Sequence, residues 1–134
     1  MIIEKLQHDG TAYVNHDAAD LLAAGVPQAA IDAALAEARI AAIKAECRRR
    51  IYAIASPEAQ MNMAAATAVI SGKTASARTD PEKDILAGAE AAIGWVAAMR
   101  ATIATLAADP ETDFISDAAW PDVPPEALAM IANF

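Results

Sequence analysis

Aromatic side chains are scarce in this sequence of 134 residues. Phe, Trp and Tyr together make up 4% of the chain, although 56% of its residues are hydrophobic. Alanine supplies most of that apolar content and buries little area per residue. Burial stabilises by roughly 25 cal/mol per Å², so we expect a thin core. A thin core in a long helical chain favours further helix partners, and we therefore expect a homo-oligomer.

Cysteine and basic residues are also few. The single cysteine, Cys47, excludes an internal disulfide framework and is compatible with a reducing cytoplasm. Lys and Arg number 10 against 18 Asp and Glu, which gives a net charge of −8. This balance argues against general binding to nucleic acid or to anionic membranes. It favours solubility, or a partner with a basic face.

Signals for export and for membrane insertion are missing as well. Residues 1–5 lack the basic start and the apolar stretch of a signal peptide. No apolar run approaches the roughly 20 residues that a membrane span requires. We therefore expect a protein that binds no membrane. It should stay in the compartment where it is made, or leave it as part of a larger assembly.

Strand signals are confined to residues 1–14. The residues that suit strands are Ile2, Ile3, Tyr13 and Val14. Asp9-Gly10 lies between them and is typical of a two-residue hairpin turn. Because two strands alone are marginally stable in water, we expect this hairpin to pack on helices or on another chain.

A short helix and a long helix follow the hairpin. The short helix covers residues 15–24, with Asn15 or Asp17 as its cap and Gly25 at its end. Pro27 suits the first position of the long helix, which spans roughly 28 residues, or about 42 Å. Its apolar stripe comprises Ile31, Leu35, Ile40, Ile43, Cys47, Ile51 and Ile54.

Two more helices each begin with a capping residue followed by proline and glutamate. Ser56-Pro57-Glu58 starts a helix that ends at Gly72, and a polar loop of residues 73–79 follows. The apolar face of this helix comprises Met61, Ala65 and Val69. Asp80-Pro81-Glu82 starts the second long helix, which Asp109-Pro110 ends. Its stripe comprises Ile85, Ala89, Ala92, Ile93, Val96, Met99, Ile103 and Leu106.

Together these patterns predict an all-α fold with a short N-terminal β-hairpin. The two long helices are similar in length and are expected to form an antiparallel helical hairpin or a small helical bundle. The expected organisation is a β-hairpin over 1–14, a helical domain over 15–109 and a proline-rich tail over 110–134. A last short helix is expected over 125–133. Whether the chain kinks or turns back at Ser56-Pro57 stays open.

Two glycines interrupt the second long helix. Gly88 and Gly94 each cost about 1 kcal/mol of helix stability relative to alanine. The simplest reason for both is the close approach of another helix.

No set of residues in the sequence indicates catalysis. Ser71-Gly72-Lys73-Thr74 resembles the end of a phosphate-binding P-loop, but Thr67 occupies the position of the required glycine and a helix precedes it. A helix C-cap is the better interpretation. His8 and His16 match no spacing of zinc ligands and are expected at the surface. We therefore expect no enzyme activity, no catalytic residue, no cofactor and no metal.

The first long helix carries the only cysteine, and three consecutive arginines follow it. Cys47 lies on the apolar stripe, so a buried and inert thiol is expected. Arg48, Arg49 and Arg50 are consecutive and point in three directions around the helix. Pairing with Glu46 or with acids on a facing helix is the favoured interpretation, and binding of an acidic partner is the alternative.

The two tryptophans differ in context. Trp95 lies beside the apolar stripe of the second long helix, so packing is the favoured interpretation. Trp120-Pro121 lies in the proline-rich tail, where a tryptophan suits the anchor of a binding surface. Folding of Trp120 back onto the helices is equally compatible with the sequence.

Several short motifs resemble proteins of bacteriophage tails. One set resembles the helical C-terminal segment of many small tail-fibre-associated proteins and comprises Arg49-Arg50-Ile51, Gln60, Asn62, Trp95 and Arg100. The ending Trp120-Pro121-Asp122-Val123-Pro124 resembles the C-termini of phage tail fibre assembly proteins and tail assembly chaperones. The resemblance covers roughly residues 35–125. The N-terminal hairpin, the loop of residues 73–79 and the extended end at 125–134 lie outside the pattern.

This resemblance implies a non-enzymatic phage or prophage protein. It implies an assembly chaperone that binds another tail or tail fibre protein, in the cytoplasm of the bacterial host. The alternative is a structural helical oligomer that is built into the virion tail or tail fibre. Under either interpretation, Trp120, Pro121 and Pro124 are the expected contacts with the partner.

Overall fold

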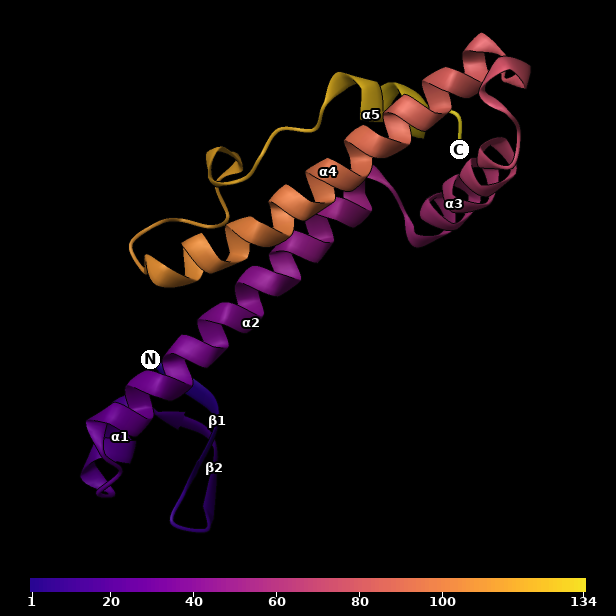
Figure 1. Cartoon of the computed structure of the whole chain (residues 1–134). Coiled ribbons are helices and arrows are strands. Elements are labelled where there is room, and N and C mark those ends of the chain that lie inside the picture. Colours follow the sequence, from indigo (N-terminus) through magenta and orange to yellow (C-terminus); the bar gives the residue numbers. More distant parts are fainter. The chain divides into compact units, whose positions relative to one another are not determined.

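The computed structural model describes all 134 residues, Met1–Phe134 (Figure 1). The fold is mainly α, with 67% of residues helical, and it carries the predicted two-stranded antiparallel hairpin at the N-terminus. Its elements are β1 (Ile2–His8), β2 (Thr11–Asp17), α1 (Ala18–Ala23), α2 (Gln28–Ile54), α3 (Pro57–Ser71), α4 (Asp80–Ala108) and α5 (Pro125–Ile131). Two short 3₁₀ turns cover Ala75–Ala77 and Asp117–Ala119.

The chain forms two compact units, Met1–Ala45 and Glu46–Phe134, and α2 contributes residues to both. This division differs from the boundaries after residues 14 and 109 that the sequence suggested. Composition and proline content mark where elements end. They do not mark where a continuous helix passes from one set of packing partners to the next.

The hairpin of the first unit turns at Asp9-Gly10, as predicted. Both residues have positive φ angles, 47° and 77°, which suits a two-residue turn that follows the twist of the strands. The strands pair from His8↔Thr11 to Ile2↔Asp17, so β2 extends beyond the predicted end at residue 14. Asp17, rather than Asn15, caps α1, because its carboxylate accepts a hydrogen bond of 2.9 Å from the backbone N–H of Ala19.

Branched aliphatic side chains fill the core of the first unit. The buried residues of this cluster are Ile3, Leu6, Leu21, Val26 and Ile31. Gly25, with φ of 87°, ends α1, and Val26 then donates its backbone N–H to Leu21 over 3.0 Å. This left-handed termination turns the chain back and delivers Val26 into the core.

The break at Ser56-Pro57 separates two helices. Ser56 Oγ accepts a hydrogen bond of 3.1 Å from the N–H of Ala59, and Pro57 occupies the first turn of α3. The chain therefore leaves α2 after Ile54 and starts a new helix instead of kinking within one.

The predicted apolar face of α3 was wrong. Met61 and Val69 are 72% and 68% exposed, whereas Met63 and Ile70 are buried. Alanine is frequent along this helix, and one methionine lies on each side of Asn62, so two of its faces have nearly the same hydropathy. The sequence pattern therefore predicted as buried the face that lies outward in the structure.

Side-chain hydrogen bonds fasten the connection between α3 and α4. Gly72 closes α3 by donating its N–H to Ala68, which confirms the C-cap interpretation of this segment. The Arg78 guanidinium donates to the backbone carbonyls of Ile70, Ser71 and Lys73. Thr79 and Glu82 form a reciprocal capping box at the start of α4, and Lys73 pairs with the Glu82 carboxylate.

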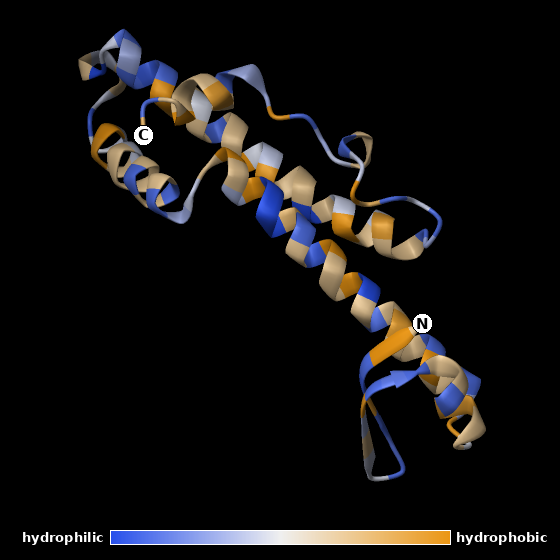
Figure 2. Cartoon of the chain, turned by 180° about the vertical axis from the view of Figure 1, so that it is seen from behind, coloured by the Kyte–Doolittle hydropathy of each residue, from blue (hydrophilic) through white to orange (hydrophobic).

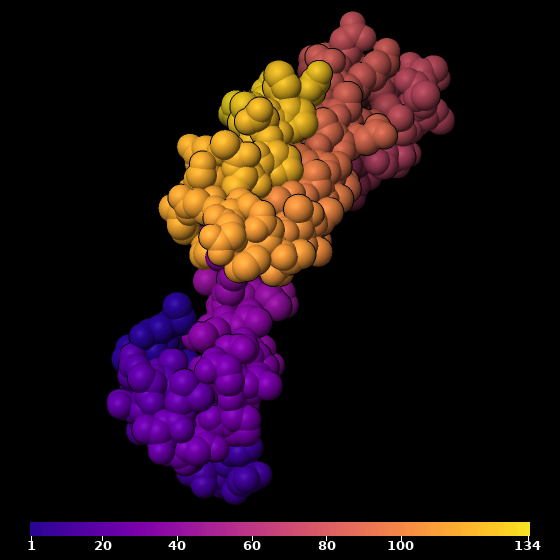
Figure 3. All heavy atoms as spheres, turned by 90° about the vertical axis from the view of Figure 1, so that its left-hand side faces the viewer, coloured from indigo at the N-terminus to yellow at the C-terminus, as the bar shows by residue number.

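Helix α5 packs closely on α4 at one of the two interrupting glycines. A Cβ added to Gly88 would lie 2.3 Å from Met130 Cβ, so only glycine allows this approach. Figure 3 shows the yellow C-terminal atoms lying against the orange atoms of α4. The same expectation was wrong for Gly94, because an added Cβ there meets nothing within 4 Å.

Helix α4 is long and apolar enough to cross a membrane by length and composition alone. The expectation that no segment reaches this size was therefore wrong, because α4 has 29 residues and few charges in its middle. In Figure 2 its ribbon is mostly in the pale and orange shades of apolar residues. That the protein binds no membrane remains a prediction.

Candidate functional site

Residues 109–124 follow α4 and carry only acidic charge, and we call them the acidic strap. The acidic residues of the strap are Asp109, Glu111, Asp113, Asp117 and Asp122. No Lys, Arg or His occurs anywhere from residue 101 to the end of the chain. Most of the strap is irregular, and its conformation is fixed by side chains of the helices and by side chains of the strap itself.

Arg50 on α2 anchors the strap by two hydrogen bonds. Its Nη1 donates to Asp117 Oδ1 and its Nη2 donates to the backbone carbonyl of Ile115, both over 2.7 Å. The guanidinium spans 65 residues of sequence to make the second bond. It thereby holds the turn at Asp117–Ala119 against the last turns of α2.

Glu46 orients this arginine from one helical turn earlier. Its carboxylate, 8% exposed, accepts hydrogen bonds of 2.7 Å from Arg49 and from Arg50 Nε. Hydrogen bonds from Arg49 lower the pKa of Glu46, although burial acts in the opposite direction. The predicted pairing of the arginines with Glu46 is confirmed for Arg49 and Arg50. The additional acid, Asp117, lies in the strap and not on a facing helix.

Trp120 folds back onto the second unit. It is 7% exposed, and its Nε1 donates to the backbone carbonyl of Phe114 over 2.7 Å. The Arg50 guanidinium lies 5.6 Å from the centroid of the ring, in the range of a cation–π contact. The buried indole therefore fixes the conformation of the strap, to which Trp120 itself belongs.

Trp95 holds the strap from α4. It is 6% exposed, which confirms the packing interpretation, and its Nε1 donates to the backbone carbonyl of Pro121 over 3.1 Å. The sequence did not predict that Trp95 and Arg50 both donate hydrogen bonds to the strap. The scarcity of aromatic residues was the available signal, since both tryptophans of the chain serve this segment.

The anchored strap presents polar and apolar side chains on its outer side. Ile115 is 59% exposed and the Asp117 side chain is 98% exposed despite its bond to Arg50. Asp122 is exposed, and Pro121 and Pro124 are half-buried. Pro121, Pro124 and Trp120 as contacts with a partner stay predictions. Because Trp120 is buried, its own contribution is to position the residues around it.

An apolar groove of about 660 Å³ lies between α3 and α4 in the second unit. Ile51 in the last turn of α2 and Ala55, which follows that helix, also line it. Among its polar residues, Gln60 donates to the carbonyl of Ala55, and Thr67 donates to that of Met63. Ser71 and Arg100 are the other polar residues that line the groove.

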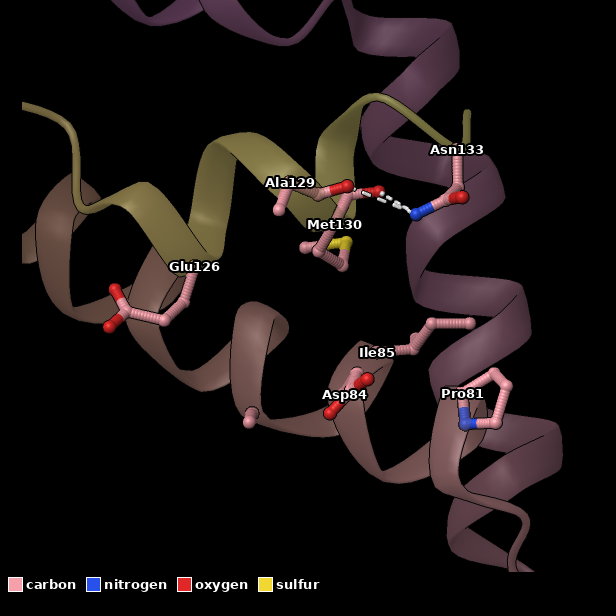
Figure 4. Close-up of a pocket in the computed structure, with 8 residues that line it drawn as sticks. Pro81, Asp84, Ile85, Glu126, Ala129, Met130 and Asn133 are labelled. Carbon is pink, nitrogen blue, oxygen red and sulfur yellow. Dashed lines mark hydrogen bonds between the residues drawn. The ribbon is translucent and has the colours of Figure 1, made fainter.

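A second pocket, of about 420 Å³, lies between the first turns of α4 and α5 (Figure 4). Asp84 and Glu126 are its two carboxylates, and Asn133 donates to the carbonyls of Ala129 and Met130 at the end of α5. No group of three or more His, Cys, Asp or Glu side chains converges to hold a metal ion, here or elsewhere in the structure.

Cys47 is a buried thiol beside the anchor residues. It is 3% exposed, and burial raises its pKa although the positive charge of Arg100 acts to lower it. The reactive thiolate is therefore disfavoured. The prediction of a buried side chain is confirmed.

The two histidines do not form a site. His8 lies 3.4 Å from the carboxylate of Asp9 at the hairpin turn. His16 is exposed and meets the edge of the Tyr13 ring with centroids 5.6 Å apart. The two imidazoles therefore serve separate local contacts.

No protein-family model matches this chain, and no curated protein is significantly similar to it.

Proposed function

We propose that the chain is a non-enzymatic phage or prophage protein that acts as a tail or tail fibre assembly chaperone. The motifs that resemble such proteins support this proposal, and several of their residues meet at the strap. Arg50, Trp95 and Trp120 come from three segments of the sequence and together fix residues 109–124. A chaperone needs a stable binding surface and no catalytic groups.

The single observation that carries the proposal is the anchored, acidic conformation of the strap. An irregular segment held on a helical scaffold is the usual place for recognition. Fixing its backbone in advance lowers the ordering cost of binding. Ile115 and the prolines offer apolar contacts, and the surrounding carboxylates attract a basic surface.

The partner that fits this surface is a tail or tail fibre protein with a basic face. Net charge of −8 and a strap without any cation favour steering of such a partner by long-range attraction. Complex formation during assembly places the protein in the cytoplasm of the bacterial host.

The proposal includes the finer architecture of the second unit. We propose that the last turns of α2 pair antiparallel with α4 as a helical hairpin. Support comes from Cys47, whose pKa responds to Arg100 on α4, and from the burial of Ile51, Trp95 and Met99. The pairing supplies the base on which the strap is fixed.

Gene deletion followed by complementation tests the proposal. In the bacterium that encodes the chain, its deletion should yield induced particles that lack tails or tail fibres in electron micrographs. The wild-type gene should restore them, and the double reversal Asp113→Lys with Asp122→Lys should not. The matched control is Glu4→Lys with Glu37→Lys, which changes two exposed acids outside the strap and should restore assembly.

The position of the chain after assembly separates the chaperone from the alternative. A chaperone should be absent from purified particles by mass spectrometry. Presence in a fixed ratio to the tail proteins would instead indicate a structural helical oligomer, which the uncovered apolar face of α4 favours. Normal particles from the deletion strain would contradict both.

A further inference from the structure

One face of α4 is apolar and largely uncovered. Of the most apolar 18 residues in this helix, 17% are buried within the chain. The buried side carries Gly88, Trp95, Met99 and Leu106. Along another side, at steps of four and three residues, lie Leu86, Glu90, Ile93, Ala97, Arg100 and Ala104, which we call the outer face. Leu86 is half-buried and the other five are exposed, with Ile93 at 71%.

Alternating steps of three and four residues are the spacing of a helix that packs lengthwise against another helix. A single α4 cannot satisfy such a face by itself. The groove between α3 and α4 borders this face and shares Ile93, Ala97 and Arg100 with it. The apolar surface open to a partner is therefore continuous across the groove and the helix.

The outer face is complementary to itself when a second copy runs in the opposite direction. If the two helices cross at the level of residue 95, Glu90 lies opposite Arg100 of the second copy. Ile93 then lies opposite Ala97, and Leu86 opposite Ala104. The two residue numbers of every pair have the same mean, 95, so a single two-fold axis at that level relates all three pairs. Opposite charges meet and a large side chain faces a small one, which suits close helix packing.

Both charged residues of this face lack an ion-pair partner within the chain. Neither Glu90 nor Arg100 forms a salt bridge, and both side chains belong to exposed residues. They lie about 15 Å apart along α4, ten residues at 1.5 Å each. That distance prevents them from pairing with each other and leaves both for the second copy.

We infer that α4 pairs antiparallel with α4 of a second copy of this chain, through the outer face and with two Glu90–Arg100 ion pairs. A parallel pair would place Glu90 against Glu90 and Arg100 against Arg100, which is repulsive. Insertion into a lipid bilayer would bury one acidic and one basic side chain near the middle of the span. Antiparallel pairing satisfies both charges and covers the apolar residues between them. This inference does not rest on the role in tail assembly.

Charge reversal and mixing test the pairing on the full chain. Light scattering should give wild-type protein a mass twice the 13.9 kDa of one chain. Glu90→Arg alone and Arg100→Glu alone should each weaken the dimer at least about tenfold, because two attractive pairs become repulsive. An equimolar mixture of the two variants should form a heterodimer, since every opposed pair then has opposite charges. Circular dichroism checks that each variant keeps its helix content.

Other outcomes overturn the inference. A monomeric wild type at every concentration, or a dimer that neither reversal weakens, would show that the outer face is not the interface. A mixture that stays monomeric would exclude the proposed register. Co-sedimentation of wild-type protein with phosphatidylcholine vesicles, together with a monomeric mass, would assign α4 to a membrane instead. Asp84→Lys, an exposed charge change on the side of α4 that faces α5 and away from the outer face, is the matched control and should leave the dimer intact.

Discussion

The two units of this protein reach a stable fold by different means. The first unit packs branched aliphatic side chains around a hairpin and closes its helix with a left-handed glycine. The second unit is built from alanine-rich helices and depends on two tryptophans, one buried glutamate and an arginine that spans to the strap. Both units leave large apolar side chains exposed. In the first unit these are Met1, Ile2, Val14 and Leu22, and in the second they are Tyr52, Met61, Val69, Ile93, Ile115, Leu128 and Phe134.

This difference shows what a thin core requires. Alanine buries too little area to fix the position of a neighbouring segment, so a few aromatic and charged contacts carry that task. The same helices then present apolar surface that another polypeptide is able to cover. In the first unit, by contrast, the core cluster consists of five buried aliphatic side chains.

Trp120→Ala is the substitution that should change the second unit most strongly relative to the first. We expect it to destabilise the second unit by about 3–5 kcal/mol, because it removes a buried indole and its bond to the Phe114 carbonyl. Residues 109–124 should then exchange their amide hydrogens quickly, and the fluorescence of Trp95 should shift towards that of exposed indole. Trp120→Phe, which keeps an aromatic ring but not the N–H donor, should lose less. Unchanged exchange in the strap after Trp120→Ala would refute its role as an anchor.

Leu21→Ala is the corresponding change in the first unit. Leu21 is 1% exposed, so we expect a loss of about 2–5 kcal/mol from the hairpin and α1. Both tryptophans lie in the second unit, so thermal unfolding followed by their fluorescence should change little. Unfolding followed by exchange in β1 and β2 should move to lower temperature. Leu22→Ala, at a neighbouring residue that is 45% exposed, is the control and should have little effect.

The two glycines of α4 sharpen the comparison within the second unit. Gly88→Ala should cost about 1–3 kcal/mol, because the new Cβ meets Met130 and displaces α5. Gly94→Ala should stabilise the helix by up to about 1 kcal/mol, because its position is open. Chemical denaturation of both variants measures the difference. Equal effects of the two substitutions would contradict the close packing of α5.

The smallest expected effect is the pH dependence that Glu46 gives to the second unit. Its pKa is lowered in the folded chain, so the folded state binds the proton less readily than the unfolded state. The contribution of Glu46 to the free energy of unfolding is present above the ordinary glutamate pKa, and it is lost as the pH falls through the lowered pKa. Denaturation of wild type and Glu46→Gln at several pH values should show a difference in the free energy of unfolding that becomes smaller in acid. A difference that is constant with pH would argue against the buried carboxylate as its source.

Local signals predicted much of the fold. Asp9-Gly10, Gly25, Ser56-Pro57 and Gly72 each act through the backbone of a few adjacent residues, and each turn or helix end formed where these residues predict it. Such features depend on dihedral angles and nearby hydrogen bonds. A sequence therefore specifies them without reference to distant segments.

Features that depend on distant partners were not predictable in the same way. The buried face of α3 was assigned incorrectly because the surrounding alanines offer no contrast between Met61 and Met63. Whether Trp120 points inward was open, since the deciding contact is with Arg50, 70 positions earlier. The strap emerges as a candidate site only once those contacts are known.

The fastened connection between α3 and α4 has a consequence for the order in which the chain folds during synthesis. Arg78 and the Thr79 capping box act within about ten residues, so this helical pair closes a short loop and is able to form early. The strap and α5 leave the ribosome later and find Arg50, Trp95 and Gly88 already in place. The strap therefore takes its anchored conformation only after these residues have been synthesised, and the proposed binding through the strap follows the formation of the helices.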